Sequence, residues 1–380
     1  MKKLLILLIG VFIFAKEFVI TKYLDEKPVI GVEIEAPGKV AKLINNDFNV
    51  LDHFILDKGS NFKVKFEYQG NSLKVTYIRD ESPILIKNYK SNSPSFYPFL
   101  VHRAIYDLNN YFSLQPAGFL IRKVVYAMLT APRQSSIYLG DYTLTYKKRI
   151  ITGGLNIFPK WADKNQRTIY FTKLNTLPEL YKFDIYTGKL TKIMQSPGML
   201  VVSDVKGDNL LLTMAKNGEP DIYIYNLKSH SLKQITTYPG IDVSGKFLGD
   251  DAIAFVSDRF GTPCVFEKNL TTGNVIRLLA HGKNQIGLDV YKNKLVISSR
   301  ETNNAFGPNT FNLFLIDIDS EGLRRLTMKG QNNFPNFSVN GTSVMFIKKE
   351  NFASKIGIIR LNEDKIFYYP LTKKLQSFDW

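Results

Sequence analysis

Short apolar runs separated by polar turns recur throughout residues 153–371. They are rich in leucine, β-branched and aromatic residues, and the first of each repeat lie at 169–172, 210–213, 253–256, 295–298 and 344–347. Each is followed by a second apolar run and by a third that carries basic residues. Runs of this length bounded by turn formers predict buried β-strands.

The spacing of the turns predicts how these strands are organised. Gly198, Gly240 and Gly282 lie 42 residues apart, and the equivalent Gly330 comes 48 residues later because residues 301–312 form an insertion. A period of about 40 to 45 residues with four strands per repeat is typical of a propeller blade, which buries its faces only by stacking on its neighbours.

The two ends of the repeat region complement each other. Three strands predicted at 123–128, 136–139 and 149–151 lack an innermost strand, whereas residues 375–380 resemble the innermost strands at 156–161 and 333–337. We therefore predict a six-bladed β-propeller over residues 119–380, closed by its C-terminal strand, which leaves few free sheet edges.

Residues 16–118 have a different pattern, which predicts a small N-terminal α/β domain. Residues 62–68 and 73–78 alternate as a hairpin, and residues 99–112 carry apolar residues at helical spacing. Residues 38–45 predict a short helix and residues 47–51 an extended segment. Residues 115–119 are the expected linker.

Residues 1–15 have the pattern of a secretory signal peptide. Lys2 and Lys3 precede an apolar run that is too short to span a bilayer and that ends at Ala15. An uncleaved anchor is the alternative. The single cysteine, Cys264, lies in a predicted strand, so an exported protein of this sequence cannot rely on disulfides.

Charge narrows the expected partners. The composition is 44% hydrophobic and 22% charged, as in ordinary globular proteins, but the net charge is +16. Residues 16–120 hold 13 basic and 12 acidic residues, whereas residues 121–380 hold 35 and 22. A basic propeller favours anionic surfaces or an acidic protein partner, and a lysine-rich surface that serves solubility is an equal alternative. We expect no nucleic acid partner.

No known catalytic motif is present. The chain has no G-x-S-x-G elbow, no H-E-x-x-H, no phosphate-binding glycine loop and no Cys/His cluster, so we predict no catalytic, cofactor-binding or metal-binding residue. Asp204, Asp242 and Asp289 recur near the first strand of successive repeats. They suggest either a weak cation site in the channel or, as the plainer explanation, hydrogen bonds between blades.

Strand parity places the loops between blades at one end of the propeller. These loops combine apolar residues with amides, which suits a protein-binding surface. The candidate residues are Asn156, Met199, Leu200, Ile241, Asp242, Asn284, Gln285, Asn332 and Asn333. The alternative is that Leu200 and Ile241 pack into the channel wall.

Residues 253–263, Ile-Ala-Phe-Val-Ser-Asp-Arg-Phe-Gly-Thr-Pro, resemble the L-A-F-T-S-D-R-x-G-x-P repeat of the TolB family of periplasmic proteins. Residues 221–223 and 232–236 also fit, and the order of signal peptide, small domain and propeller is similar. The family's W-S-P-D-G turn is altered at residues 161–164 and 337–341, so the chain resembles a divergent member.

This resemblance implies a non-enzymatic, monomeric periplasmic adaptor of the Tol-Pal system without a cofactor. It implies binding of the lipoprotein Pal on the propeller loops and of TolA through Glu17, Phe18, Val19 and Ile20. Through Pal it implies an indirect association with peptidoglycan and the outer membrane, and a role in outer-membrane integrity and in envelope constriction during cell division.

Two alternatives come from the residues themselves. A carbohydrate- or cell-wall-binding propeller is supported by the basic excess and by Tyr223 and Tyr225. A propeller-type hydrolase or lactonase would require converging carboxylates and a bound cation.

Overall fold

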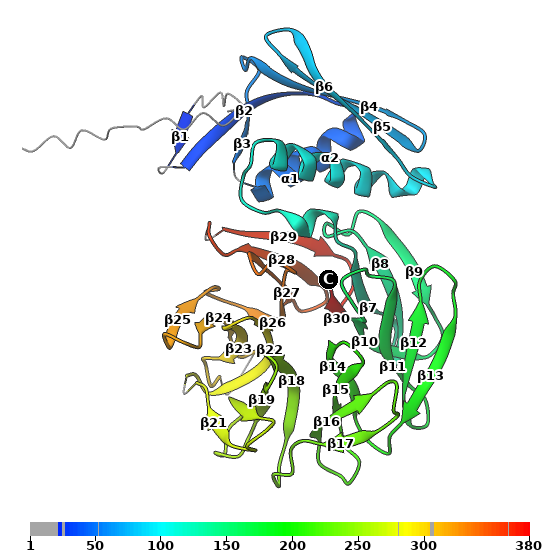
Figure 1. Cartoon of the computed structure of the whole chain (residues 1–380), viewed down its shortest axis with the longest axis vertical. Coiled ribbons are helices and arrows are strands. Elements are labelled where there is room, and N and C mark those ends of the chain that lie inside the picture. The colour runs from blue at the N-terminus through cyan, green and yellow to red at the C-terminus, as the bar shows by residue number, and fades with distance from the viewer. Residues whose placement is uncertain (1–21, 25–26, 52, 280, 305–307, 364) are drawn as a thin grey trace, which may run out of the picture. The chain divides into compact units, whose positions relative to one another are not determined.

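The computed structural model describes residues 22–380 except 25–26, 52, 280, 305–307 and 364 (Figure 1). The predicted signal peptide lies outside the described residues. The chain divides into two compact units, Met1–Gln115 and Pro116–Trp380. Among the described residues, neither α-helix has the length and apolar character needed to cross a membrane.

The first unit is a mixed sheet with two helices. In spatial order its strands are β1 (Lys22–Leu24), β2 (Lys27–Glu35), β4 (Phe62–Gln69), β5 (Ser72–Arg79) and β6 (Ser82–Lys90), with β3 (Phe54–Leu56) paired to β2. The helices are α1 (Gly38–Leu51), α2 (Tyr97–Tyr111) and the 3₁₀ turn η1 (Pro94–Phe96). The strict alternation in β4 and β5 turns Phe62, Val64 and Val75 into the core.

Helix α1 is longer than predicted, and the extended segment expected at residues 47–51 is wrong. Leu43, Phe48 and Leu51 form one buried stripe of α1, so tertiary packing prevails over the weak helix propensity of residues 45–47. Within this buried layer the Asp47 carboxylate lies 2.8 Å from Nδ1 of His102 on α2. The helix predicted at residues 99–112 is confirmed as α2.

The second unit consists of antiparallel strands in sets of four, called repeats here. Repeat 1 contains β7 (Val124–Ala131), β8 (Gln134–Gly140), β9 (Lys147–Ile151) and the last strand, β30 (Leu375–Asp379). Repeat 2 contains β10 (Leu155–Trp161), β11 (Thr168–Leu174), β12 (Pro178–Asp184) and β13 (Leu190–Gln195). Repeat 3 contains β14 (Leu200–Lys206), β15 (Asn209–Met214), β16 (Asp221–Asn226) and β17 (Leu232–Gln234).

The remaining repeats have the same plan. Repeat 4 contains β18 (Asp242–Leu248), β19 (Ala252–Ser257), β20 (Cys264–Asn269) and β21 (Val275–Arg277). Repeat 5 contains β22 (Asn284–Tyr291), β23 (Lys294–Arg300), β24 (Phe311–Asp317) and β25 (Gly322–Arg325). Repeat 6 contains β26 (Gln331–Phe337), β27 (Ser343–Lys349), β28 (Ser354–Arg360) and β29 (Lys365–Leu371).

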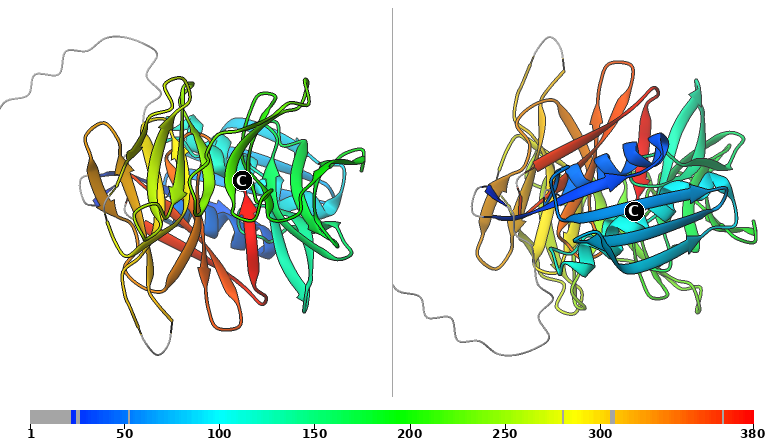
Figure 2. Two further views of the ribbon diagram at one scale, coloured as in Figure 1. Left: turned by 90° about the horizontal axis from the view of Figure 1, so that it is seen from below. Right: turned by 90° about the horizontal axis from the view of Figure 1, so that it is seen from above.

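The repeats are arranged around a centre, as in a β-propeller. Figure 1 shows β10, β14, β18, β22, β26 and β30 nearest the middle of the second unit, with β9, β13, β17, β21, β25 and β29 at its periphery. The two views in Figure 2 show the sheets of this unit side by side, face against face. Neighbouring sheets share their cores: Tyr170 and Leu180 of repeat 2 pack in one cluster with Leu210 and Leu212 of repeat 3. Each repeat therefore depends on its neighbours for burial.

The C-terminus is part of this arrangement. Phe378 is the pairing partner of Tyr126, and Asp379 that of Val125, so β30 lies antiparallel to β7. The indole nitrogen of Trp380 donates to the carbonyl oxygen of Phe337 at 3.0 Å. The chain preceding β7, predicted as a linker at residues 115–119, includes Phe119, which is buried beside Trp380 with 6.1 Å between ring centroids.

We expect Trp380→Ala to destabilise the second unit by about 3–5 kcal/mol, the usual cost of removing a buried tryptophan. The change deletes an indole that is only 5% exposed together with its hydrogen bond. Urea unfolding followed by circular dichroism measures the effect. Phe352→Ala is the control, because Phe352 is 90% exposed. Equal midpoints for the two variants would contradict a structural role for the last residue.

Candidate functional site

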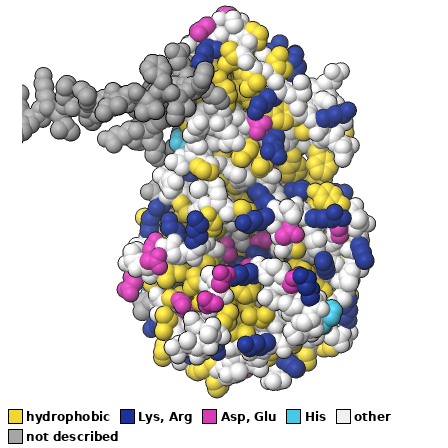
Figure 3. Space-filling model, in the orientation of Figure 1, with side chains coloured by type: hydrophobic (Ala, Val, Ile, Leu, Met, Phe, Trp, Pro, Cys, Tyr) yellow, Lys and Arg dark blue, Asp and Glu magenta, His cyan; other side chains and the backbone are white. Residues whose placement is uncertain are grey.

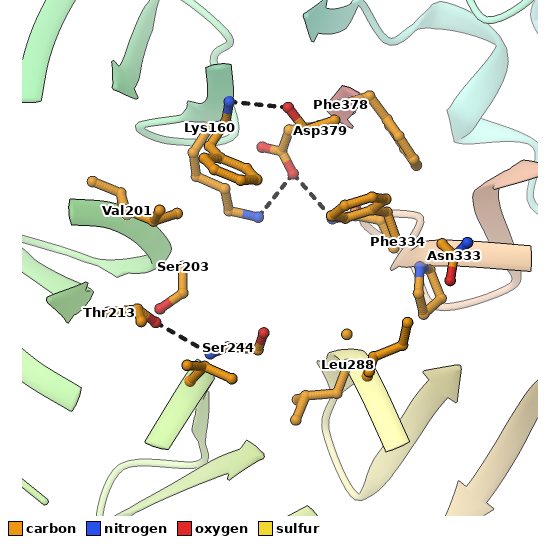
Figure 4. Close-up of a pocket in the computed structure, with 18 of the residues that line it drawn as sticks. Lys160, Val201, Ser203, Thr213, Ser244, Leu288, Asn333, Phe334, Phe378 and Asp379 are labelled. Atoms are coloured by element: carbon orange, nitrogen blue, oxygen red, sulfur yellow. Dashed lines mark hydrogen bonds and ion pairs between the residues drawn. The ribbon is translucent and has the colours of Figure 1, made fainter. Parts of the chain in front are cut away.

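The innermost strands surround a cavity of about 350 Å³ at the centre of the second unit. Its apolar lining comes from several repeats, and Figure 4 shows Val201, Leu288 and Phe334 facing this space from different strands. Phe158 and Phe378 line it as well. The cavity lining is thus mainly apolar, with several polar side chains from the inner strands.

Those polar groups occupy equivalent positions of the six inner strands, and we call them the channel ring. In the order of the repeats they are Asp379, Lys160, Asp204, Lys246, Asp289 and Asn336. The Lys160 ammonium lies 2.8 Å from the Asp379 carboxylate, as drawn in Figure 4, and the Lys246 ammonium lies 2.8 Å from Asp289. Carboxylates alternate with lysines or an amide around the ring, so that its charges largely neutralise one another.

Each carboxylate of the channel ring also joins two repeats through the backbone. Asp379 accepts a hydrogen bond from the amide of Trp161, Asp204 from that of Phe247 and Asp289 from that of Phe337, at 2.7–2.9 Å. Hydrogen bonding between blades, the plainer of the two explanations for Asp204 and Asp289, is what the structure shows. Among the described residues no group of three or more His, Cys, Asp or Glu side chains is placed to hold a metal ion.

The charge state of Lys160 follows from the same contacts. Burial by itself lowers the pKa of the Lys160 ammonium, but the carboxylate of Asp379, helped by Asp289 and Asp204, outweighs burial and raises the pKa. Lys160 is therefore charged at neutral pH, and a charge this deep must keep its partner.

Backbone bulges aim two of these side chains at Asp379. The pairing register shifts between Ile157 and Lys160 in β10 and between Asn333 and Asn336 in β26. At both bulges a phenylalanine before a proline, Phe158 or Phe334, has φ of 53°. This conformation costs a bulky residue about 1–3 kcal/mol and persists only where the surroundings enforce it. Lys160 and Asn336 consequently both reach the Asp379 carboxylate.

Most of the side chains predicted to bind a partner are buried at the same end of the inner strands. Asn156, Leu200, Asp242, Gln285, Asn332 and Asn333 are all at most 5% exposed. Asn156 donates to the carbonyl oxygen of Ser135 and Asn332 to that of Phe311, each on the preceding repeat. Gln285 accepts from the amide of Val265. These side chains form hydrogen bonds inside the propeller, and they hold the loops in place.

The other predicted residues differ in exposure. Met199 is 45% exposed, whereas Ile241 and Asn284 are partly buried. Asp242 lies 3.1 Å from the Arg259 guanidinium, which stacks on Tyr238 with 5.1 Å to the ring centroid. The predicted segment Glu17, Phe18, Val19 and Ile20 lies outside the described residues.

Exposed apolar side chains gather on the loops at this end, and we call them the apolar rim. They come from loops before the first strand or after the second strand of a repeat: Leu177, Met199, Tyr238, Phe260, Met328 and Phe352. Among the described loops of the second unit, only Tyr186 and Val339 are comparably exposed at the opposite end. Of these six residues, only Met199 was predicted from the sequence. Phe260 and Met328 could have been predicted from the sequence, because each is an apolar residue within a polar turn.

Tyr223 and Tyr225, which supported a carbohydrate-binding surface, are 4% and 7% exposed and belong to the core between repeats 2 and 3. They are not available to stack on a sugar. In the orientation of Figure 3 the visible surface of the second unit mixes basic and acidic side chains with apolar ones.

Comparison with known proteins decides the family. A model described as the TolB beta propeller domain matches residues 116–368. The chain belongs to the TolB family. It is 37% identical over 414 residues to the Tol-Pal system protein TolB of Helicobacter hepaticus, covering 99% of both chains. It is 40% identical to that of Campylobacter jejuni over 352 residues, covering 89% of this chain and 87% of the relative.

Solved structures agree on the fold. TolB from Acinetobacter baumannii has a TM-score of 0.76 at 18% identity and covers 95% of this chain and 98% of its own. A nidogen/laminin complex has a TM-score of 0.53 at 11% identity, covering 67% of this chain. TolB membership makes the protein a non-enzymatic component of the Tol-Pal system of the cell envelope.

We expect Asp379→Ala to lower the free energy of unfolding by about 3–5 kcal/mol, because it leaves a buried ammonium and the Trp161 amide without their acceptor. Asp250→Ala is the matched control: Asp250 also pairs with a lysine, Lys206, but is exposed, so little change is expected. Urea unfolding at pH 7 compares them. Similar midpoints would show that the channel ring does not hold the repeats together.

Proposed function

We propose that this TolB-family protein is a monomeric periplasmic adaptor that docks Pal on the apolar rim and contacts TolA through residues 17–20. It would thereby support outer-membrane integrity and envelope constriction during division, with an indirect link to peptidoglycan. The observation that carries the proposal is the concentration of exposed apolar side chains around one end of the central cavity. Exposed apolar groups on a soluble surface indicate a protein partner.

The proposed platform is a six-bladed ring. Six four-stranded repeats and the pairing of β30 with β7 support a ring that the C-terminal strand closes. Closure would leave no inner sheet edge free, and it would hold the loops of all blades in one plane. A rigid platform favours docking because little conformational entropy is lost on binding.

The rim has the layout of a binding surface. Met328 and Phe352 are 76% and 90% exposed, and the cavity between the inner strands offers a hollow for a protruding side chain. Beneath the rim, buried amides such as those of Asn156 and Asn332 hold the loops to the preceding repeat. Apolar anchors on a fixed frame are the groups that dominate binding energy at protein interfaces.

The TolA contact rests on the sequence. Residues 17–20 form a short apolar segment that precedes the polar stretch 21–28. Such a segment can pair within its own domain or add to the sheet edge of a partner, and Pal docking would act on TolA binding if it biased that equilibrium.

Introducing a charge at the rim tests the Pal contact. We expect Met328→Asp and Phe352→Asp each to weaken Pal binding at least about tenfold, the effect of losing more than about 1.4 kcal/mol. Isothermal titration calorimetry with purified Pal measures this. Ile276→Asp is the matched control, because Ile276 is 56% exposed but lies on the outer strand β21. The rim is not the Pal site if all three variants bind Pal like the unaltered protein.

Deleting residues 16–22 should abolish TolA binding and leave Pal affinity unchanged, because the segment is separate in sequence from the propeller loops. Pull-down with purified TolA and titration with Pal read the two effects separately. A variant with residues 16–22 in shuffled order controls for the length of the chain. TolA binding that survives the deletion rules out this segment.

A further inference from the structure

The outer strand of repeat 1 carries three successive cations without counter-charges. Lys147, Lys148 and Arg149 of β9 are all exposed, and β9 is paired on one side only, to β8, among the described strands. None of the three takes part in an ion pair with a described residue. Figure 3 shows basic side chains along the side of the second unit where β9 lies.

The surrounding sequence contains almost no acid. Asp141 is the sole acidic residue between positions 116 and 162, and its carboxylate is fully buried. It accepts hydrogen bonds from the backbone amides of Thr143 and Tyr146, so it stabilises the turn before β9. The exposed surface of β7, β8 and β9 therefore has no negative side chain of its own.

On two other outer strands, a basic side chain is paired with a carboxylate. Lys192 of β13 lies 2.5 Å from the carboxylate of Glu179, and Arg325 of β25 is paired with Glu301. Repeat 1 lacks such partners. A basic surface that served solubility alone would not require acidic side chains to be absent from this region.

Three more cations extend this surface toward the end of repeat 1 that corresponds to the apolar rim. Arg133 lies on the turn between β7 and β8, and Lys373 and Lys374 precede β30. All three are exposed, and the carbonyl oxygen of Lys374 accepts from the amide of Leu129 on β7. Arg149, Lys148 and Lys147 are paired with residues four to six positions from Gln134, so this turn is roughly 13–20 Å along the sheet from the β9 cations at about 3.3 Å per residue.

We propose that this surface, formed by β9 and extended by Arg133, Lys373 and Lys374, binds the anionic phosphate headgroups of a phospholipid membrane. The cations are long, exposed and spread over an outer edge, which suits many separate phosphates on a plane better than one compact ligand. Each lysine or arginine close to an anionic membrane strengthens binding about fivefold. The proposal adds to the proposed function and does not depend on Pal or TolA.

Vesicle sedimentation with the purified protein tests the proposal. We expect binding to vesicles of phosphatidylcholine with 30% phosphatidylglycerol in 0.1 M NaCl, little binding to pure phosphatidylcholine, and loss of binding in 0.5 M NaCl, where charges are screened. The triple variant Lys147→Glu, Lys148→Glu, Arg149→Glu should bind the anionic vesicles about a hundredfold more weakly.

A control variant with the same change in net charge separates the site from overall charge. Lys189, Lys216 and Lys233 are exposed in repeats 2 and 3, and changing all three to Glu should leave most of the vesicle binding intact. An equal loss in both variants would assign the effect to net charge, and unchanged binding by the β9 variant would overturn the proposal. So would binding of a soluble acidic peptide, polyglutamate, in preference to vesicles. The circular dichroism spectrum of the β9 variant should match that of the unaltered protein, which shows that it is folded.

Discussion

The structure of the second unit depends on buried side chains that bond one repeat to the next. Neighbouring sheets meet face to face, and apolar packing between them has no direction, so it does not fix how far one sheet slides along another. Hydrogen bonds are directional, so they fix this relative position. At one end of the inner strands Asn156 and Asn332 donate hydrogen bonds to the preceding repeat. In the channel ring, Asp204, Asp289 and Asp379 accept hydrogen bonds from backbone amides of the following repeat. An orphaned member of such a pair costs about 1–3 kcal/mol, which makes the alternatives unfavourable.

This use of polar groups shapes the candidate surface. The amides predicted from the sequence to contact a partner are buried and hold the loops in place. The side chains that the loops expose are apolar, among them Phe260, Met328 and Phe352. The charged residues of the channel are likewise committed to one another, as the pairs Lys160–Asp379 and Lys246–Asp289 show. In the proposed function, these exposed apolar side chains around the cavity are the groups left to contact a partner.

The sequence was most informative where periodicity carries the signal. The strands of each repeat lie where the apolar runs predicted them, because a buried strand needs a continuous apolar run whatever surrounds it. Exposure was poorly predicted, since the burial of Asp242 or Gln285 is decided by a neighbouring repeat that lies elsewhere in the sequence. The positive φ of Phe158 and Phe334 was likewise not predicted, although the shared Phe-Pro pair marks both sites. Helix α1 is longer than predicted for the same reason: its last turns are buried against residues from other parts of the chain.

The pairing of β30 with β7 determines when the first sheet can be completed during synthesis. Val125 is made long before its partner Asp379, so the nascent chain holds an incomplete first sheet until β30 has been made. Contacts between such distant residues are slow to form, because a long loop must close before they stabilise anything. A chain without β30 thus leaves one edge of β7 unpaired, and the first sheet is completed only when the two distant strands meet.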